Sequence, residues 1–420
     1  MPRRDNEVHR FLATLAYGRV SALELASIRD SGSFDFELLR ANETCSLLQC
    51  TTDTALSLIK RLGGSYKIAQ VCGNTPDELF DWLFLPDTDR FNWTVSGYES
   101  PGDAIEQLKS EFFDFLKSKS IRKAKFLEPT ISDRSEISEG LISREEMKLA
   151  DVQTRILKPP GGTSQGFDLV VEGKLDSKPL YACTESASDV SGFERRDFGR
   201  SYRDPTITMG PRIARVLVNL AAKQETRTIL DPFCGLGTIL QEALICGFSV
   251  VGSDKSASVV QKAAANLEWL RREYRLSPKL RWRILNRDAR RIFPQDLSTI
   301  DAVSTEPILL PKFESNPDSL TSSEALTKAA SVYEESIFAL IPVIRASRGR
   351  IAVITPSIMD KRGGVQDLSL APIIERTKSK LYSPGVTGLR FDYPLRIESG
   401  KRRIVNRNVF VFSSAQTPSD

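Results

Sequence analysis

The stretch ILDPFCGLGTILQEA, residues 229–243, constrains the fold more than any other part of this 420-residue chain. A short apolar run ends at Leu230, a turn containing Gly235 and Gly237 follows, and a helical pattern opens at Thr238. A strand, a glycine turn and a helix in this order form the entry unit of an open α/β sheet, where ligands bind at the carboxyl edge of the strands. The two glycines allow a sharp turn and a close approach of backbone to ligand. The stretch therefore predicts a ligand-binding loop.

The sequence after residue 210 continues the same alternation of strand and helix. We expect helices at 211–222, 238–246 and 256–274, and strands at 227–230, 249–252, 281–285, 302–305, 350–355 and 404–412. Alternation of this kind predicts a parallel sheet with helices on both faces. We therefore expect an α/β, Rossmann-like domain over residues 195–415.

The residues of the loop distinguish between two kinds of cofactor. A dinucleotide fold needs a third glycine, but Leu240 occupies that position, and the negative charge of Asp231 would repel a pyrophosphate. S-adenosylmethionine carries a sulfonium and an ammonium group and no phosphate, so Asp231 would attract it. The loop therefore favours S-adenosylmethionine over a nicotinamide dinucleotide.

Two more acids follow strand ends and complete a predicted cofactor site. Asp254 ends the second strand, at the spacing from Asp231 that suits an acceptor for the ribose hydroxyls. Asp288, after the third strand, could accept from the adenine amino group; each acid alone would also fit a helix cap or a turn. The predicted cofactor residues are Asp231, Pro232, Phe233, Gly235, Gly237, Thr238, Asp254 and Asp288.

The loop and its surroundings resemble a known family. DPFCGLGT looks like the DPFCGSGT motif of amino-methyltransferases, and residues 195–221 are similar to the lead-in of the THUMP-linked tRNA guanine-N2 methyltransferases, the position-10 guanosine enzymes. The resemblance is clear over residues 193–412 and weaker in the N-terminal half, at NWTVSGYE and FDLVVEGKLDSKPLYACTES. It implies S-adenosylmethionine as methyl donor, tRNA as acceptor and a THUMP domain that docks on the acceptor stem.

The stretch STEPILLP, residues 304–311, stands where this family keeps an Asp-Pro-Pro-Tyr motif. Glu306 can accept a hydrogen bond from an exocyclic amine, and Pro307 stiffens the loop; both are predicted catalytic residues. Ile308 and Leu309 replace the second proline and the aromatic ring, which in the family stacks on the base. Phe313 or Phe198 could supply a ring instead. The alternative is a strand-ending turn in a protein that no longer catalyses.

The N-terminal half predicts two α+β modules. Strands at 10–16 and 66–71, one or two strands within 37–51, and helices at 20–30 and 53–62 give a βαββαβ-like order of ferredoxin type over residues 1–85. An Asp or Thr cap opens the second helix. A strand in NWTVSGYE, a helix over 102–119 and strands at 167–172 and 179–184 give a THUMP-like module over residues 86–190. Within this module, residues 152–157 and the breaker cluster at 158–166 lie between the helix over 102–119 and the strand at 167–172.

Basic residues between the modules and at the C-terminal end predict contact with RNA. Arg196, Phe198 and Arg200 in RRDFGR could clamp a phosphate and cover the cofactor, or could belong to a charged linker. Residues 341–412 hold 14 Lys or Arg against 5 Asp or Glu, whereas the whole chain has a net charge of +4. A basic face suits a polyphosphate partner, although a solvated basic surface would have the same composition.

Composition excludes several other classes. No apolar run is long enough to span a bilayer, and the first residues lack the apolar core of a secretory signal. The six cysteines show no CxxC spacing and the chain has a single histidine, His9, which argues against metal sites and a Ser-His-Asp triad. We expect a cytoplasmic protein with reduced thiols, no metal, no membrane association and no indicated protein partner.

Three functions remain open from the sequence. The first is an S-adenosylmethionine-dependent RNA methyltransferase, acting on guanine N2 of tRNA. The second is a DNA amino-methyltransferase, which the same loop could serve after base flipping. The third is a catalytically silent RNA-binding protein on a methyltransferase scaffold, because fold alone does not determine function.

Overall fold

The structure is a computed structural model of the whole chain. It describes residues 7–86, 90–100, 102–127, 156, 166–204, 209–292, 299–307, 310–311, 313–345, 347–397 and 404–414. The chain divides into two compact units. The first contains Met1–Ala22, Phe34–Ser191 and Gly385–Leu389, and the second contains Leu23–Ser33, Gly192–Pro384 and Arg390–Asp420.

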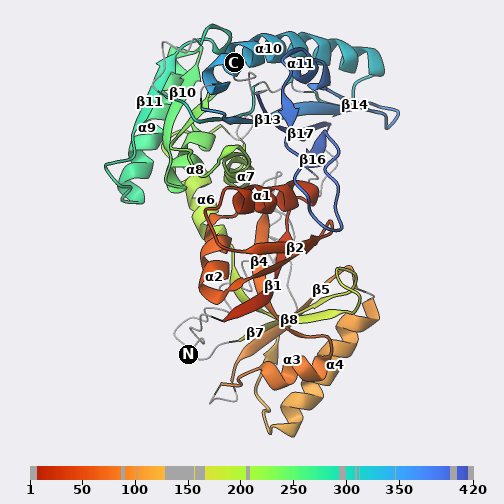
Figure 1. Ribbon diagram of the computed structural model, residues 1–420. Coiled ribbons are helices and arrows are strands. Elements are labelled where there is room, and N and C mark those ends of the chain that lie inside the picture. The colour runs from red at the N-terminus through yellow and green to blue at the C-terminus, as the bar shows by residue number, and fades with distance from the viewer. Residues whose placement is uncertain are drawn as a thin grey trace, which may run out of the picture. The chain divides into compact units, whose positions relative to one another are not determined.

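The described part of the first unit forms one eight-stranded sheet with the order β2-β3-β1-β4-β8-β7-β5-β6. Its strands are β1 (Val8–Leu15), β2 (Glu37–Ala41), β3 (Cys45–Thr51), β4 (Ser65–Gly73), β5 (Asn92–Tyr98), β6 (Lys125–Phe126), β7 (Phe167–Glu172) and β8 (Leu180–Ala187). The helices that accompany these strands in the chain are α1 (Arg19–Asp30), α2 (Thr52–Arg61), α3 (Pro76–Trp82) and α4 (Gly102–Ser118) (Figure 1).

The predicted βαββαβ order is confirmed by β1, α1, β2, β3, α2 and β4, whose strands pair antiparallel. Helix α2 begins after the predicted cap: Thr51 accepts from the backbone of Thr54 through its side chain. The second half of α1, from Leu23, belongs to the second unit. The sheet continues from β4 to β8 without a break. The expected boundary between two modules at residue 85 stays a prediction.

Packing between aromatic rings stabilises the part of the first sheet around β5. Trp93 of β5 is fully buried and meets Phe112 of α4 edge to face, with ring centroids 4.8 Å apart. Phe112 in turn contacts Phe80 of α3 at 5.4 Å. Large rings bury much apolar area in a fixed geometry. These contacts join β5 to α4 and α4 to α3. Residues 158–165, which make up most of the expected breaker cluster, lie outside the described residues.

The second unit contains a nine-stranded sheet in its described residues, with the order β11-β10-β9-β12-β13-β17-β15. Strands β14 and β16 pair with β13 and β17 outside this path. The bounds are β9 (Thr228–Asp231), β10 (Ser249–Asp254), β11 (Trp282–Asn286), β12 (Ala302–Thr305), β13 (Arg350–Met359), β14 (Val365–Asp367), β15 (Lys380–Leu381), β16 (Leu395–Ile397) and β17 (Val405–Ser413).

The first five strands of this order are parallel, and β17 joins them antiparallel. The sheet runs outward from β9 in both directions, to β10 on one side and β12 on the other. Such a reversal of strand order is a topological switch point, where open α/β sheets leave a crevice beyond their carboxyl ends. The predicted α/β, Rossmann-like fold is confirmed, and the crevice belongs at the end of β9.

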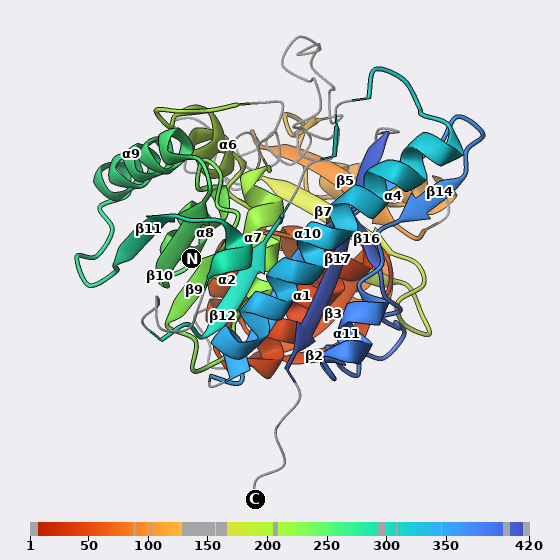
Figure 2. The ribbon, with the colours of Figure 1, turned by 90° about the horizontal axis from the view of Figure 1, so that it is seen from above.

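Helices cover both faces of this sheet. They are α6 (Val190–Phe198), α7 (Pro211–Ala221), α8 (Thr238–Ile245), α9 (Ala257–Glu273), the 3-10 turn η2 (Ala289–Arg291), α10 (Ser319–Arg345) and α11 (Ala371–Arg376). In Figure 1, α10 and α11 lie above β13 and β17, and α7 and α8 lie below. Figure 2 shows α9 beside β10 and β11, at the opposite end of the sheet from β17.

The sequence did not predict the 27-residue helix α10. Its segment contains Pro342, and its apolar residues do not form one narrow stripe, because Tyr333, Ile337 and Ile344 pack into the core while Val332 lines a cavity. The segment RRDFGR was expected to be a phosphate clamp or a charged linker, and no helix was predicted there, yet α6 continues through Phe198.

Candidate active site

A cavity of about 420 Å³ lies at the carboxyl end of β9, β10 and β12. It is lined by Met209, Asp231, Pro232, Phe233, Cys234, Gly235, Leu236, Thr238, Ile239, Asp254, Lys255, Asp288, Ala289, Arg290, Glu306, Pro307 and Val332. All of these residues belong to the second unit. The cavity therefore brings together every predicted cofactor residue except Gly237, and both predicted catalytic residues. Their individual roles stay predictions.

The loop after β9 has the backbone that its glycines allow. Gly235 has φ +50° and Gly237 has φ +88°, both in the left-handed region that favours glycine. Gly237 is the N-cap of α8. A third glycine, Gly252 in β10, leaves room for the Leu240 side chain, because a Cβ there would lie 2.6 Å from Leu240 Cδ1. Leu240 thus takes its place in α8 because β10 carries no side chain at that point.

Asp231 is the most deeply buried acid of the cavity, with 2% of its surface exposed. Its Oδ1 accepts from the Thr305 hydroxyl at 2.7 Å and from the Phe233 backbone at 3.1 Å. Burial raises the pKa of Asp231 to about 7, these two hydrogen bonds oppose the shift, and the charges of Asp254 and Glu306 add to it. A buried carboxylate with this pKa is stabilised in its charged form by a cation entering the cavity.

Asp254 and Asp288 have different surroundings. Asp254 accepts from the Ser256 backbone at 2.9 Å through Oδ1, so it caps the turn before α9 while its other oxygen keeps its acceptor capacity. Asp288 accepts from the Arg290 guanidinium at 2.7 and 3.0 Å. The hydrogen bonds from the Arg290 side chain lower the pKa of Asp288 to about 2. Asp288 also caps η2, so both acids combine the local role with a place in the cavity wall.

Glu306 follows β12 and forms an ion pair that the sequence did not indicate. Arg407 of β17 donates through Nε to Glu306 Oε1 at 2.6 Å and through Nη2 to Oε2 at 3.4 Å. The side chains are 18% exposed for Arg407 and 10% for Glu306. Arg407 was predicted only as part of a basic face. The available signal was a polar start, VNRN, to an otherwise apolar strand.

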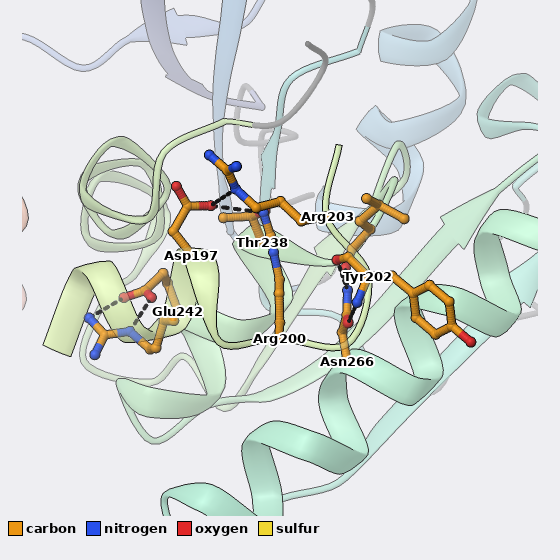
Figure 3. Close-up of polar contacts among 9 residues, drawn as sticks. Asp197, Arg200, Tyr202, Arg203, Thr238, Glu242 and Asn266 are labelled. Carbon is orange, nitrogen blue, oxygen red and sulfur yellow. Dashed lines mark hydrogen bonds and ion pairs between the residues drawn. The ribbon is translucent and has the colours of Figure 1, made fainter. Parts of the chain in front are cut away.

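The segment after α6 is bonded to the cofactor loop (Figure 3). Arg200 donates to the Thr238 hydroxyl at 2.8 Å and to Asp197 at 3.0 Å. Asn266 of α9 accepts from the backbone of Tyr202 at 2.9 Å and donates to its carbonyl and to that of Leu236. These contacts fix the loop from two sides, which preorganises the wall of the cavity.

Three of the predicted RNA-contact residues are placed differently from expectation. Arg196 is buried and pairs with Glu242 at 2.5 Å, while Arg200 is buried in the contacts described above. Neither guanidinium reaches the surface in this structure, so the predicted phosphate clamp is corrected to a packing and positioning role. Phe313 packs against the core cluster beneath α10 and does not line the cavity.

Phe198 alone of this group is exposed, at 44%. The Arg203 guanidinium lies 4.3 Å from the centroid of its ring. Phe198 does not line the cavity either, so the ring that was expected to replace the missing aromatic of STEPILLP is not found at either proposed position. Phe233 is the aromatic residue among the described cavity-lining residues. Ile308 and Leu309 lie outside the described residues.

Eight lining residues were not among the predicted site residues: Met209, Cys234, Leu236, Ile239, Lys255, Ala289, Arg290 and Val332. Arg290 also lies 3.5 Å from Glu335 of α10, so α10 contributes to this side of the cavity. Among the described residues no group of three or more His, Cys, Asp or Glu could hold a metal ion. No described helix is long and apolar enough to cross a membrane.

Comparison with known proteins supports the interpretation of this cavity as part of a methyltransferase domain. Residues 200–277 match a family model described as UPF0020, RMKL-like, methyltransferase domain. The chain is similar to this family over these residues. The matched segment covers the loop after β9, α8, β10 and α9, which carry most of the cavity.

Relatives with known names extend this match along the chain. The tRNA (guanine(10)-N2)-dimethyltransferase of Methanothermobacter thermautotrophicus is 24% identical over 353 residues, which are 83% of this chain and 89% of that protein. The enzyme of the same name from Pyrococcus abyssi is 45% identical over 76 residues, 18% of this chain and 22% of that protein. The recognition of this family from the two sequence motifs is confirmed.

Solved structures support the fold. A possible methylase from Clostridium difficile 630 has a TM-score of 0.50 and 13% identity, covering 99% of this chain and 100% of that chain. TrmN from Thermus thermophilus has a TM-score of 0.50 and 14% identity, covering 97% and 100%. At this level of identity the likeness concerns the arrangement of the elements, and it extends over both units of the chain.

Proposed function

We propose that this protein is an S-adenosylmethionine-dependent methyltransferase that acts on N2 of guanine in tRNA. The observation that carries the proposal is the cavity itself. At the switch point of a methyltransferase fold, buried Asp231 and the partly buried Asp254 and Glu306 line one space of a size that suits a nucleoside cofactor. The relatives named as tRNA (guanine(10)-N2)-dimethyltransferases support the acceptor.

The residues of the cavity fit S-adenosylmethionine. Asp231 has one oxygen engaged by Thr305 and Phe233, which leaves Oδ2 for a cationic group. Asp254 would hold the ribose hydroxyls, and Asp288 with the backbone near Ala289 would face the adenine. When bound, S-adenosylmethionine supplies an activated methyl group on a positively charged sulfur. The acids favour this charge, whereas they disfavour a pyrophosphate.

Glu306 and Pro307 would hold the accepting amine. The exocyclic amine of guanine is a weak nucleophile because its lone pair is delocalised into the ring. A carboxylate oxygen of Glu306 accepts one N–H hydrogen and draws the nitrogen toward tetrahedral geometry. Pro307 restricts the backbone next to it. The contribution of these residues is therefore position and electrostatics, which govern in-line transfer.

The first unit would bind the tRNA outside the cavity. Its α+β sheet includes the segments that resemble a THUMP module, and the TrmN likeness covers this half of the chain as well. The basic residues of the C-terminal stretch would add non-specific attraction to the phosphate backbone. A cytoplasmic location is part of the same proposal, because it is where such a substrate is met.

Nucleoside mass spectrometry tests the proposal. Purified protein is incubated with unmodified tRNA and S-adenosylmethionine that carries a labelled methyl group, and the digested nucleosides are analysed. The proposal predicts label in N2-methylguanosine or its dimethyl form, and a loss of about 100-fold or more in the rate for Glu306→Ala. Label in adenine or cytosine of DNA would support the DNA methyltransferase instead. Tight tRNA binding without any transfer would support the silent RNA-binding protein.

A further inference from the structure

The ion pair between Glu306 and Arg407 explains a departure from the family motif. Relatives of the Asp-Pro-Pro-Tyr type carry aspartate where this chain has glutamate. Arg407 lies on β17, and β13 separates that strand from β12, because β12 pairs with β13 and β13 with β17. Neighbouring strands are about 4.8 Å apart, so the two side chains bridge about 10 Å.

The length of the glutamate matters for this bridge. Arg407 is directly opposite Pro356 of β13, while Thr305, one residue before Glu306, is opposite Val353. The guanidinium therefore reaches over β13 to meet the carboxylate. An aspartate at position 306 is shorter by one methylene, about 1.5 Å, and a contact of 2.6 Å would open beyond hydrogen-bonding distance.

The charges around Glu306 give the arginine a second effect. From β9 and β10 the cavity receives Asp231 and Asp254, and from the segment after β11 it receives Asp288. The cations of the lining are Lys255, which follows Asp254, and Arg290, which is bound to Asp288 and Glu335. Arg407 of β17 contacts Glu306 itself, and its charge-assisted hydrogen bonds hold the Glu306 carboxylate against the repulsion of these acids.

The two contacts differ in a way that suits an acceptor. Oε1 is held at 2.6 Å, whereas Oε2 is 3.4 Å from Nη2. A carboxylate offers about four acceptor positions, so Oε2 keeps capacity for an amine hydrogen while Oε1 fixes the orientation. The lining of the cavity by Glu306 places this capacity where a substrate would be.

We propose that Arg407 is a positioning residue, which holds the Glu306 carboxylate toward the accepting amine, and that glutamate is required at position 306 because aspartate cannot reach Arg407. The inference rests on the proposed function for its effect on methyl transfer. Its geometric part does not depend on the substrate. A consequence is that restoring the aspartate of the family motif impairs this protein.

The experiment compares single-turnover methyl transfer to tRNA in the full chain and in five variants. These are Arg407→Met, Arg407→Lys, Glu306→Gln, Glu306→Asp and the double variant Arg407→Met with Glu306→Gln. Arg271→Met is the matched control, because Arg271 lies on α9, outside the basic C-terminal stretch, and donates to the Leu280 carbonyl at 2.7 Å instead of to a cavity carboxylate. Circular dichroism and the affinity for S-adenosylmethionine, measured by calorimetry, are followed for each variant.

The proposal predicts that Arg407→Met and Glu306→Gln each slow transfer about 100-fold, with cofactor affinity within about threefold of wild type. The double variant should be no slower than the slower single variant, because residues that act as a unit are not additive. Arg407→Lys should recover part of the rate, and Glu306→Asp should be slowed about tenfold or more. Arg271→Met should transfer at the wild-type rate.

Effects of Arg407→Met and Glu306→Gln that multiply, or transfer by Arg407→Met within about twofold of wild type, would overturn the proposal. If the wild-type protein transfers no methyl group to tRNA, the proposed function fails and the crystal structure of Glu306→Asp decides the geometric part. In that variant, a carboxylate at position 306 that lies out of reach of Arg407 supports the inference. An intact ion pair there refutes it.

Discussion

The Lys67–Asp168 ion pair of the first unit and the Arg407–Glu306 ion pair of the second differ in what surrounds them. Lys67 and Asp168 of the first unit approach to 2.6 Å, as do Arg407 and Glu306 of the second. Asp168 is fully enclosed: its oxygens also accept from Ser96 at 3.0 Å and from Thr184 at 2.6 Å. Glu306 borders a cavity and has one loosely held oxygen.

The comparison shows why burial alone does not mark a functional charge. Burial, the largest single cause, lowers the pKa of Lys67, but the charges and hydrogen bonds of Asp168 and Tyr98 together outweigh it and the net shift is upward. The Lys67 pair therefore stabilises the fold below the ordinary pKa of lysine, and this contribution is lost as pH rises through the raised value. The described partners of Asp168 belong to the sheet and occupy its oxygens, whereas a carboxylate that borders a cavity keeps capacity for a ligand.

The largest effect is expected where the pair is sealed. Asp168→Ala leaves the Lys67 ammonium buried without its partner, which typically costs about 3–5 kcal/mol of stability. Urea denaturation followed by the fluorescence of buried Trp93 measures the change. Asp176→Ala is the control, because Asp176 pairs with Arg10 and Arg40 at long distances near the surface and should cost at most about 1 kcal/mol. Equal costs for the two variants would remove the contrast between sealed and exposed pairs.

A smaller change in stability is expected at the pair that borders the cavity. Arg407→Met should lower the free energy of unfolding by about 1–2 kcal/mol, because water in the cavity solvates the Glu306 carboxylate after the arginine is removed. The same denaturation assay, followed by circular dichroism, measures it. A loss as large as that of Asp168→Ala would mean that Arg407 serves the fold and would break the comparison.

The charge of Asp231 predicts a pH dependence of cofactor binding. Its pKa of about 7 lies above the usual range, so the folded protein retains a proton that the unfolded chain releases near pH 4, and this group costs stability as pH rises between those values. A cationic cofactor favours the ionised form. Affinity for S-adenosylmethionine should therefore rise from pH 6 to pH 8, by at most about tenfold per pH unit below 7.

Calorimetry in two buffers of different ionisation enthalpy checks this dependence, because binding at pH 6 should release a proton. The Asp231→Asn variant should bind more weakly at pH 8 and lose the proton release. Wild-type affinity that is constant over this range, with no proton release, would show that the cofactor does not meet Asp231.

The smallest effect is expected at Asp288. Its carboxylate is already engaged by Arg290 on a partly exposed part of the wall, so its removal should weaken cofactor binding by only about threefold. Calorimetric titration of Asp288→Ala at pH 8 measures this. A loss as large as that of Asp231→Asn would show that Asp288 is a principal contact and that its ion pair opens on binding.

The sequence predicted the cofactor half of the site better than the acceptor half, and the reason is physical. The residues from Asp231 to Thr238 are contiguous, and glycines with positive φ leave a signal that can be read locally. Strand ends in phase placed Asp254 and Asp288 at the same edge. The confirmed fold class follows from the same alternation of short elements.

Contacts between distant segments were not predictable in this way. Glu306 and Arg407 are 101 residues apart, and their meeting depends on β17 entering the sheet antiparallel beside β13. The burial of Arg196 was not predicted, because a short basic segment has the same local composition in an exposed linker and in a buried helix. The countercharge that allows its burial, Glu242, comes from a distant part of the chain. Helix α10 was not predicted, because its sides face the core, the cavity and solvent and its apolar residues therefore do not form one stripe.

A crystal structure of the protein soaked with S-adenosylmethionine tests the central claim most directly. We predict density for the cofactor in the cavity at the end of β9, with the ribose hydroxyls on Asp254, the positively charged part beside Asp231 and the transferable methyl group directed toward Glu306. A cavity that stays empty at saturating cofactor, or a cofactor bound with its methyl group away from Glu306, would contradict the account.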